Sequence, residues 1–247
     1  MIRVAAVVAA YDEAETIEPL ARRLRAALMQ LPDAASEIVL VIEGRDGTRQ
    51  IVEDLAPELG SLRVLYKEDP AGLGEAFRRG FAAVDSSVDF VVTMDADLNH
   101  RPEEISMLLS ALVESGADIV VGSRFVRGSH MAGMPVWKRV VSRCVNAFMT
   151  RLYRVKVHDK TSGFRIYRAD VLRSLSFENS DFAFLPELLV RAARSGAEII
   201  ERPIQFEYRH AGRSKMALAT TFRSYLRLFL SLSRPHVTEE TAPRVER

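Results

Sequence analysis

The sequence has little cysteine, no long apolar run and no excess of one charge, and each absence narrows the possible functions. Cys144 is the only cysteine among 247 residues, so the chain forms no internal disulfide and has no cysteine cluster for zinc. We expect Cys144 to be a small packed residue in a reducing compartment. No stretch reaches the ~18 consecutive apolar residues of a membrane span, and no cleavable signal pattern opens the chain. The absences predict a cytosolic protein.

The charge balance and the lack of a linker give two further predictions. Lys and Arg number 34 and Asp and Glu number 33, and this formal charge of +1 argues against nucleic acid as a partner. No segment rich in Gly, Pro or Ser divides the chain, which predicts one domain over residues 1–234. Within it we expect a nucleotide-binding half over 1–123, an acceptor-side half over 124–216 and an amphipathic helix over 217–233. A disordered tail is expected over 235–247.

Five apolar, β-branched runs in the first half are each followed by a segment with helical spacing. The runs are Val4–Ala10, Ile38–Ile42, Leu62–Tyr66, Phe90–Met94 and Ile119–Gly122. Continuous apolar strands that alternate with helices are typical of an α/β fold with a mostly parallel sheet and helices on both faces. In the second half we expect helices over 135–154 and 182–195, a strand over 162–167 and an extended segment over 197–208.

Asp95 and Asp97 are the most informative residues, because they directly follow the apolar run 88–93. In an open α/β sheet, ligands bind outside the carboxyl ends of the strands. Acids at positions i and i+2 there can hold a divalent cation that keeps vacant positions for phosphate oxygens. The alternative is that the pair only caps a turn.

Three other predicted strand ends carry candidate residues. Glu13 lies among acids at the start of a helix, where ordinary capping is the alternative role. Glu43 ends the second strand and is a candidate acceptor of hydrogen bonds from a ribose or a base. Gly72 and Gly74 permit a tight turn and a close approach to a ligand or to a helix.

Taken in order, these segments resemble the GT-A type inverting nucleotide-sugar glycosyltransferases, and within them the dolichol-phosphate (polyprenol-phosphate) mannose synthase family. Seven segments carry the resemblance: YDEAETI at 11–17, EGRDGT at 43–48, GLGEAFRRGF at 72–81, MDADLNHRPEEI at 94–105, GSRFVRGS at 122–129, TSGFRIYRADVL at 161–172 and GRSK at 212–215. The resemblance implies a GT-A (Rossmann-like) fold. It also implies inverting transfer of a hexose, usually mannose from GDP-mannose, to a polyprenyl phosphate, with Mg²⁺ or Mn²⁺ under the diphosphate.

The resemblance also implies roles for individual residues. The metal and diphosphate ligands would be Asp95 and Asp97, with Asn99 as a further ligand of the metal. Residues around the donor and acceptor would be Tyr11, Glu13, Glu43, Gly72, Gly74, Ser162 and Arg165. Arg124 resembles an arginine that contacts phosphate at the acceptor side, and Arg213 and Lys215 match a mobile basic loop that closes over the diphosphate. The catalytic set is therefore Asp97, Arg124, Arg213 and Lys215.

The chain departs from the family pattern at three places, and all three concern the nucleoside. Ala10 replaces a proline, Ile42 and Glu43 replace an aspartate pair, and residues 69–71 lack the basic residue that commonly precedes the glycines. Nucleoside recognition then depends more on Glu43. A phosphate acceptor is already ionised and needs positioning, whereas a hydroxyl acceptor needs a general base. Asp159 is the candidate base, and a loop or helix-terminal acid is its alternative role.

Residues 135–160 combine seven basic residues and one acid with apolar side chains at helical spacing, including Trp137. Such a helix is typical of binding to an anionic membrane surface, and a second apolar helix over 218–232 has the same character. Ordinary packing against the core is the alternative for both helices. We therefore expect a peripheral enzyme on the cytoplasmic face of the membrane. The alternatives are a transferase with a soluble acceptor and, less favoured, a non-catalytic nucleotide-sugar-binding protein.

Overall fold

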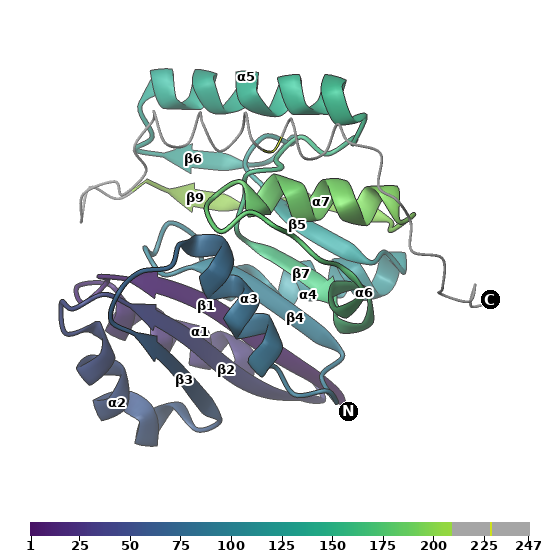
Figure 1. The fold of residues 1–247 in the computed structure, drawn as a ribbon. Helices are drawn as coiled ribbons and strands as arrows, with labels where there is room; N and C mark the ends of the chain where they lie inside the picture. Colours follow the sequence, from purple (N-terminus) through teal and green to yellow (C-terminus); the bar gives the residue numbers. More distant parts are fainter. Residues whose placement is uncertain (209–227, 229–247) are drawn as a thin grey trace.

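A seven-stranded sheet forms the centre of the protein, in a computed structural model that describes residues 1–208 and Leu228 (Figure 1). Its strands lie in the order β3-β2-β1-β4-β7-β5-β8, and only β7 runs antiparallel to its neighbours. The fold is therefore α/β with a mostly parallel sheet, as predicted. The strand bounds are β1 Ile2–Tyr11, β2 Ala34–Glu43, β3 Leu62–Lys67, β4 Phe90–Asp95, β5 Ile119–Ser123, β7 Arg165–Arg168 and β8 Ile199–Pro203.

Helices cover both faces of this sheet (Figure 1). One core cluster joins the sheet to α1 and α4, and a second joins it to α3, α6 and α7. Helix α2 packs on α1 through a small third cluster. The helix bounds are α1 Ile17–Met29, α2 Thr48–Leu59, α3 Leu73–Ala83, a 3₁₀ turn η1 Pro102–Glu104, α4 Ile105–Ser115, α6 Ala169–Ser174 and α7 Phe184–Arg194. Burial of two sheet faces explains the continuous apolar strands.

A further helix, α5 (Val136–Tyr153), and a two-stranded parallel sheet of β6 (His130–Ala132) and β9 (Gln205–Glu207) lie beside the main sheet (Figure 1). The predicted helix over 135–154 is confirmed as α5. The expectation for Cys144 is wrong, because this residue is exposed on α5. The predicted strand over 162–167 begins only at Arg165, since the preceding residues turn beneath the end of β4.

Several predicted features lie outside the described residues. They are Arg213, Lys215, the helix over 217–233 apart from Leu228, and the tail over 235–247. Leu228 is fully buried and belongs to the core cluster of α3, α6 and α7. Within the described part of the chain, no helix has both the length and the apolar character needed to cross a bilayer.

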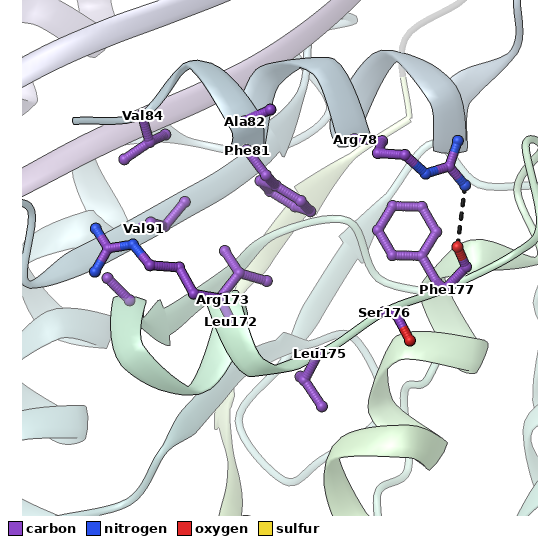
Figure 2. A pocket seen from close by; sticks show the side chains of 11 residues that line it. Arg78, Phe81, Ala82, Val84, Val91, Leu172, Arg173, Leu175, Ser176 and Phe177 are labelled. Carbon is purple, nitrogen blue, oxygen red and sulfur yellow. Dashed lines mark hydrogen bonds between the residues drawn. The ribbon is translucent and has the colours of Figure 1, made fainter. Parts of the chain in front are cut away.

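A cavity of about 350 Å³ lies between α3 and α6, near the amino end of β4 at Val91 (Figure 2). Its lining is mostly apolar, and its two arginines bind main-chain oxygens. Arg78 donates to the carbonyl of Phe177, and Arg173 donates to the carbonyl of Val88. Because ligands of open α/β sheets bind at the carboxyl ends of strands, this cavity is not the candidate site.

The glycines at the start of α3 pack against a loop. Gly74 N–H donates to the carbonyl oxygen of Ser180 at 2.8 Å, and a Cβ on Gly72 or Gly74 would collide with the main chain of residues 179–180. The small size of both glycines therefore serves helix-to-loop packing in this structure. That agrees with the approach to a helix expected from the sequence, while their contact with a substrate stays a prediction.

Glu187 on α7 holds the loop that contacts those glycines. Its carboxylate is fully buried and accepts the N–H groups of Glu178 at 2.9 Å and Asn179 at 3.0 Å. It also accepts Nε of Arg191 at 2.8 Å. A buried charge with this many partners keeps its loop in one conformation.

We predict that Glu187→Ala lowers the free energy of unfolding by roughly 3–5 kcal/mol, the usual cost of leaving the partner of a buried ion pair uncompensated. Urea denaturation measures the effect. Glu178→Ala is the matched control, because Glu178 pairs with the same Arg191 but its side chain is 71% exposed. The control should change the free energy of unfolding by no more than about 1 kcal/mol. Equal losses in the two variants would contradict a special role for Glu187.

Candidate functional site

The loops after β1 and β2 form one hydrogen-bonded unit at the carboxyl edge of the sheet. Glu13 N–H donates to Oγ1 of Thr48 at 2.9 Å, and Ala14 N–H donates to Oδ2 of Asp46 at 2.9 Å. Asp46 also accepts the N–H of Thr48, the first residue of α2, at 3.0 Å. Tyr11 precedes this unit with 41% of its surface exposed. The edge therefore offers an exposed aromatic ring next to a rigid pair of loops.

Glu43 lies below this edge and is 3% exposed. Its Oε2 accepts the N–H of Ala71 at 3.0 Å, and Oε1 lies 3.5 Å from Nη1 of Arg79. The side chain thus fastens the end of β2 to the loop before α3. Both carboxylate oxygens have protein partners in this conformation, so contact with a ribose or base stays a prediction.

Asp95 ends β4, and Asp97 follows it two residues later, as the apolar run predicts. Burial raises the pKa of Asp95, the positive charges of Arg124 and Arg165 lower it, and Glu13 raises it. Burial, the Asp95 charge and Glu13 raise the pKa of Asp97. These mutual effects place Asp95, Asp97, Glu13, Arg124 and Arg165 within electrostatic reach of one another.

The turn before β7 forms the floor under Asp95. A Cβ on Gly163 would lie 2.9 Å from both carboxylate oxygens of Asp95, so only glycine leaves room for that carboxylate. Ser162 is buried and donates to the carbonyl of Gly122 at 2.7 Å. Arg165 is fully buried and donates to the carbonyls of Leu185 and Lys160 at 2.8 and 2.6 Å. Ser162 and Arg165 support the site from below, and their predicted contact with a substrate is untested.

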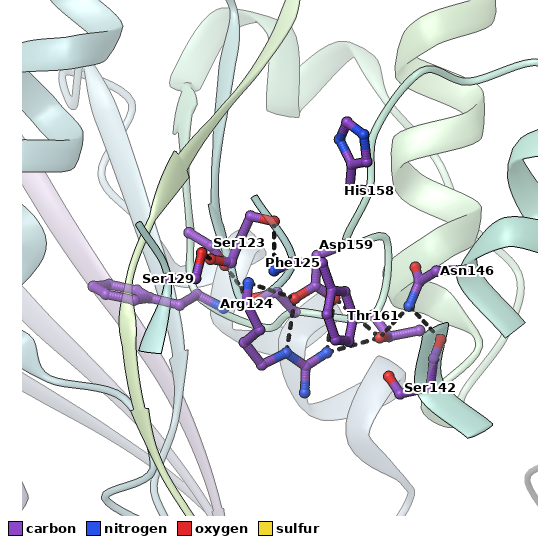
Figure 3. A network of polar contacts seen from close by, with 12 residues as sticks. Ser123, Arg124, Phe125, Ser129, Ser142, Asn146, His158, Asp159 and Thr161 are labelled. Atoms are coloured by element: carbon purple, nitrogen blue, oxygen red, sulfur yellow. Dashed lines mark hydrogen bonds and ion pairs between the residues drawn. The ribbon is translucent and has the colours of Figure 1, made fainter. Parts of the chain in front are cut away.

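Arg124 and Asp159 form a tight ion pair beside this floor (Figure 3). Nε and Nη2 of Arg124 each donate to a different oxygen of Asp159 at 2.7 Å, and the N–H of Arg124 adds a bond of 2.9 Å. Burial would raise the pKa of Asp159, but the charge and hydrogen bonds of Arg124 hold it below its ordinary value. Asp159 is therefore a poor general base, and the alternative role of a structural acid is the better one.

The ion pair is linked to α5 by side chains that the sequence did not single out (Figure 3). Nη2 of Arg124 donates to Oγ1 of Thr161 at 2.9 Å, and Nδ2 of Asn146 on α5 donates to the same oxygen at 3.2 Å. The Asn146 side chain also accepts the N–H of Lys160 at 2.7 Å. Asn146 is 2% exposed. A polar residue on the inner face of an amphipathic helix was its only sequence signal.

The segment after Asp97 holds the end of β9. Glu207 N–H donates to the carbonyl of Asn99 at 3.0 Å, and Nε of Arg101 donates to the Glu207 carboxylate at 3.0 Å. Tyr208 N–H donates to the carbonyl of Ala132 at 2.8 Å. The chain therefore leaves β9 beside Asn99, and the predicted roles of Arg213 and Lys215 stay predictions.

The donor set at the carboxylates suits a metal whose coordination a substrate completes. Among the described residues, no group of three His, Cys, Asp or Glu side chains is placed to hold a metal ion. Asp95 and Asp97 supply two carboxylates that burial and mutual repulsion disfavour as anions, and Asn99 donates its N–H to Oδ1 of Asp97 at 3.0 Å. Mg²⁺ is commonly bound by one or two carboxylates plus substrate phosphates. The residues present fit such a site.

Residues 5–176 match the model of the glycosyl transferase family 2. A polyprenol monophosphomannose synthase of Mycolicibacterium smegmatis is 35% identical over 222 residues, which cover 87% of this chain and 81% of that protein. An undecaprenyl-phosphate mannosyltransferase of Micrococcus luteus is 34% identical, with 87% and 88% covered. A dolichol-phosphate mannosyltransferase of Pyrococcus furiosus is 31% identical over 92% of this chain and 62% of its own length.

Solved structures with the same fold include glucosyl-3-phosphoglycerate synthase from Mycobacterium tuberculosis in complex with UDP. Its TM-score is 0.66 at 24% identity, with 93% of this chain and 79% of that chain covered. Mannosyl-3-phosphoglycerate synthase from Rubrobacter xylanophilus has a TM-score of 0.69 at 17% identity, with 98% and 79% covered. These likenesses confirm the predicted GT-A architecture.

The raised pKa values of Asp95 and Asp97 predict a pH dependence of stability when no divalent cation is present. The folded state binds these protons more tightly than the unfolded chain, so their contribution is present at low pH. It is lost as the pH rises above about 4 and through the raised values. Asp97→Asn removes one of the two charges. Between about pH 5 and pH 8 the free energy of unfolding of the wild type should fall by roughly 1–3 kcal/mol more than that of the variant. This range corresponds to a shift of about one to two pKa units, at about 1.4 kcal/mol for each unit.

Chemical denaturation of both proteins at the two pH values, with chelator present, measures this difference. Titrations shared by the two proteins cancel in the comparison. Parallel curves for wild type and variant would show that the two carboxylates do not strain the fold.

Proposed function

Because the chain belongs to the glycosyl transferase family 2, we propose that it transfers a hexose, mannose, from a nucleoside diphosphate sugar, GDP-mannose, to a polyprenyl phosphate with inversion. The observation that carries this proposal is the 31–35% identity to three relatives whose names specify mannose and a polyprenyl-type phosphate acceptor. The arrangement of Asp95, Asp97 and Arg124 around one edge of the sheet supports it.

On the donor side, the exposed ring of Tyr11 suits stacking on the base, and the diphosphate would lie next to Asp95 and Asp97. These carboxylates and the side-chain oxygen of Asn99 would hold Mg²⁺ or Mn²⁺. When bound, the metal neutralises the charge that develops on the leaving diphosphate. Arg213 and Lys215 would add positive charge from a segment that begins at Tyr208, beside Asn99.

On the acceptor side, two arginines share one aromatic ring. The guanidinium of Arg124 lies 5.3 Å and that of Arg143 lies 5.6 Å from the centroid of Phe125. Arg143 belongs to α5, and Asp159 fixes the orientation of Arg124. A guanidinium binds phosphate through charge-assisted hydrogen bonds, so this pair suits the acceptor phosphate. An ionised phosphate attacks without a general base, which agrees with the ion-paired state of Asp159.

The outer face of α5 supports docking on a membrane surface. It exposes five large apolar side chains, Val136, Trp137, Val140, Val141 and Phe148, at 45–71% exposure. Exposed basic residues at Arg151, Arg154 and Lys156 lie at its carboxyl end. An apolar face flanked by basic residues suits an anionic membrane surface, and the cytoplasmic leaflet is anionic. We therefore place the enzyme peripherally on that face, where a polyprenyl phosphate would reach Arg124 past α5.

Transfer of radiolabelled sugar tests the proposed function. With GDP-mannose, Mg²⁺ or Mn²⁺ and a polyprenyl phosphate, we expect label in the organic phase, and Asp97→Ala should abolish it without unfolding the protein. Asp54→Ala is a matched control, because Asp54 is an exposed acid on α2, outside the carboxylate site. Label only in an aqueous product would favour the soluble-acceptor alternative. No transfer from any nucleotide sugar would favour the non-catalytic one.

Membrane docking should depend on salt. Each basic residue near an anionic surface contributes about 1 kcal/mol, screened over a Debye length of about 8 Å at physiological ionic strength. Sedimentation with anionic vesicles at low salt should recover the wild type. Replacement of Arg151, Arg154 and Lys156 by Glu should release it. Replacement of Arg22, Arg49 and Arg168 by Glu gives an equal charge change on α1, α2 and β7, and should leave the protein bound.

Trp137 gives an internal measurement, because it is the only tryptophan and is 51% exposed. Its fluorescence should shift to shorter wavelength when anionic vesicles are added, and neutral vesicles should have little effect. A wild type that ignores anionic vesicles, with no response from Trp137, would contradict the docking of α5.

A further inference from the structure

His100 is buried next to the carboxylate pair without a hydrogen-bond partner. It is 2% exposed, and within the part of the chain that the structure describes neither Nδ1 nor Nε2 has a hydrogen-bond partner. Its ring packs against Phe164 and Phe206, with both centroid distances at 5.4 Å. A buried polar group without a partner is rare in native proteins and costs about 1–3 kcal/mol. The site therefore contains an imidazole, although a phenyl ring would fill the same space at a lower cost in free energy.

The nearest polar group identifies the missing partner. Nδ1 of His100 lies 3.7 Å from Oδ2 of Asp95, which is less than 1 Å beyond the length of a charge-assisted hydrogen bond. Gly163 lies against both oxygens of Asp95, with room for no side chain at that position. Asp95 is thus bordered by a main-chain floor and by an imidazole edge. A small rotation of the carboxylate brings Oδ2 to Nδ1.

We propose that His100 is a positioning residue for the metal ligand Asp95: its Nδ1–H donates to Oδ2 and fixes the carboxylate in the orientation that binds the divalent cation. This inference rests on the proposed function, because it assumes that Asp95 holds a metal. Carboxylates that ligate metals are themselves held by hydrogen bonds, and loss of such a partner typically costs 10–100-fold in metal affinity.

An imidazole suits this place better than a basic side chain. It donates a hydrogen bond in its uncharged form, so it can orient Asp95 without a positive charge that would repel the cation. A lysine or arginine at this place would pair with Asp95 and compete with the metal for it. The aromatic packing of Phe164 and Phe206 keeps the ring in place and excludes water from its edge.

Metal affinity provides the test, with no need for turnover. The free Mn²⁺ signal in electron paramagnetic resonance, recorded during titration in the presence of GDP, gives the dissociation constant. His100→Phe retains the aromatic packing and removes the donor, and we expect it to weaken Mn²⁺ binding by about 10–100-fold. His100→Asn places an amide N–H near the position of Nδ1, and we expect it to restore most of the affinity. Phe206→Leu is the matched control, because it disturbs the packing and leaves the donor.

The ring nitrogens give a second measurement on the wild type. Long-range ¹H–¹⁵N spectra of the protein with Mg²⁺ and GDP should show a histidine with a protonated Nδ1 whose signal disappears in His100→Phe; the signal of His158, whose Nδ1 lies 2.7 Å from the Glu201 carboxylate, should remain. The inference is overturned if a folded His100→Phe binds Mn²⁺ like the wild type, or if His100 carries its proton on Nε2 when Mg²⁺ is bound. Failure of the wild type itself to bind Mn²⁺ would instead overturn the proposed metal site.

Discussion

Two negative charges at the end of a buried strand impose the main constraint on this structure. Asp95 pairs in register with Ala9 of β1, so its position is fixed by the sheet, and Asp97 follows within the same turn. Burial raises both pKa values, the Asp95 charge raises that of Asp97 further, and the charges of Arg124 and Arg165 only partly compensate for Asp95. The fold nonetheless keeps Asp95 and Asp97 close together, because the packing of the sheet offsets the unfavourable free energy of two neighbouring carboxylates. A divalent cation with a diphosphate relieves the same repulsion, so the strain favours ligand binding.

The proposed acceptor side is built on the opposite principle, since its charges are already paired. Asp159 satisfies Arg124 from a buried position, and Thr161 and Asn146 extend that network to α5. Helix α5 therefore presents an apolar face outward, while the amide of Asn146 points inward and holds the network around Arg124. An arginine held in this way loses little conformational entropy when it binds phosphate, which is the advantage of preorganised charge over a flexible side chain.

The sequence predicted the features that local pattern determines. Continuous β-branched runs identify the parallel strands, and the acids after the run 88–93 identify the carboxyl edge where the candidate site lies. It did not reveal the antiparallel placement of β7 between β4 and β5, because strand pairing is set by tertiary packing. The partners of Glu43 and Asp159 were hidden for the same reason: an acid at a strand end has the same local sequence whether it meets a ligand or an arginine. Cys144 was misjudged because a small thiol is usually buried, whereas α5 exposes its whole outer face.

The arrangement around Asn99 connects events at the metal to events in the basic segment. Asn99 accepts the main-chain N–H of Glu207, and Arg101 binds the Glu207 carboxylate, so the residues that would ligate the metal also hold the last turn of chain before Tyr208. Arg213 and Lys215 follow β9 in the sequence. In the proposed function, the metal ligand Asn99 is therefore joined by one main-chain hydrogen bond to the strand that precedes the proposed basic loop. A contact of this kind offers a short physical connection between the metal site and that loop.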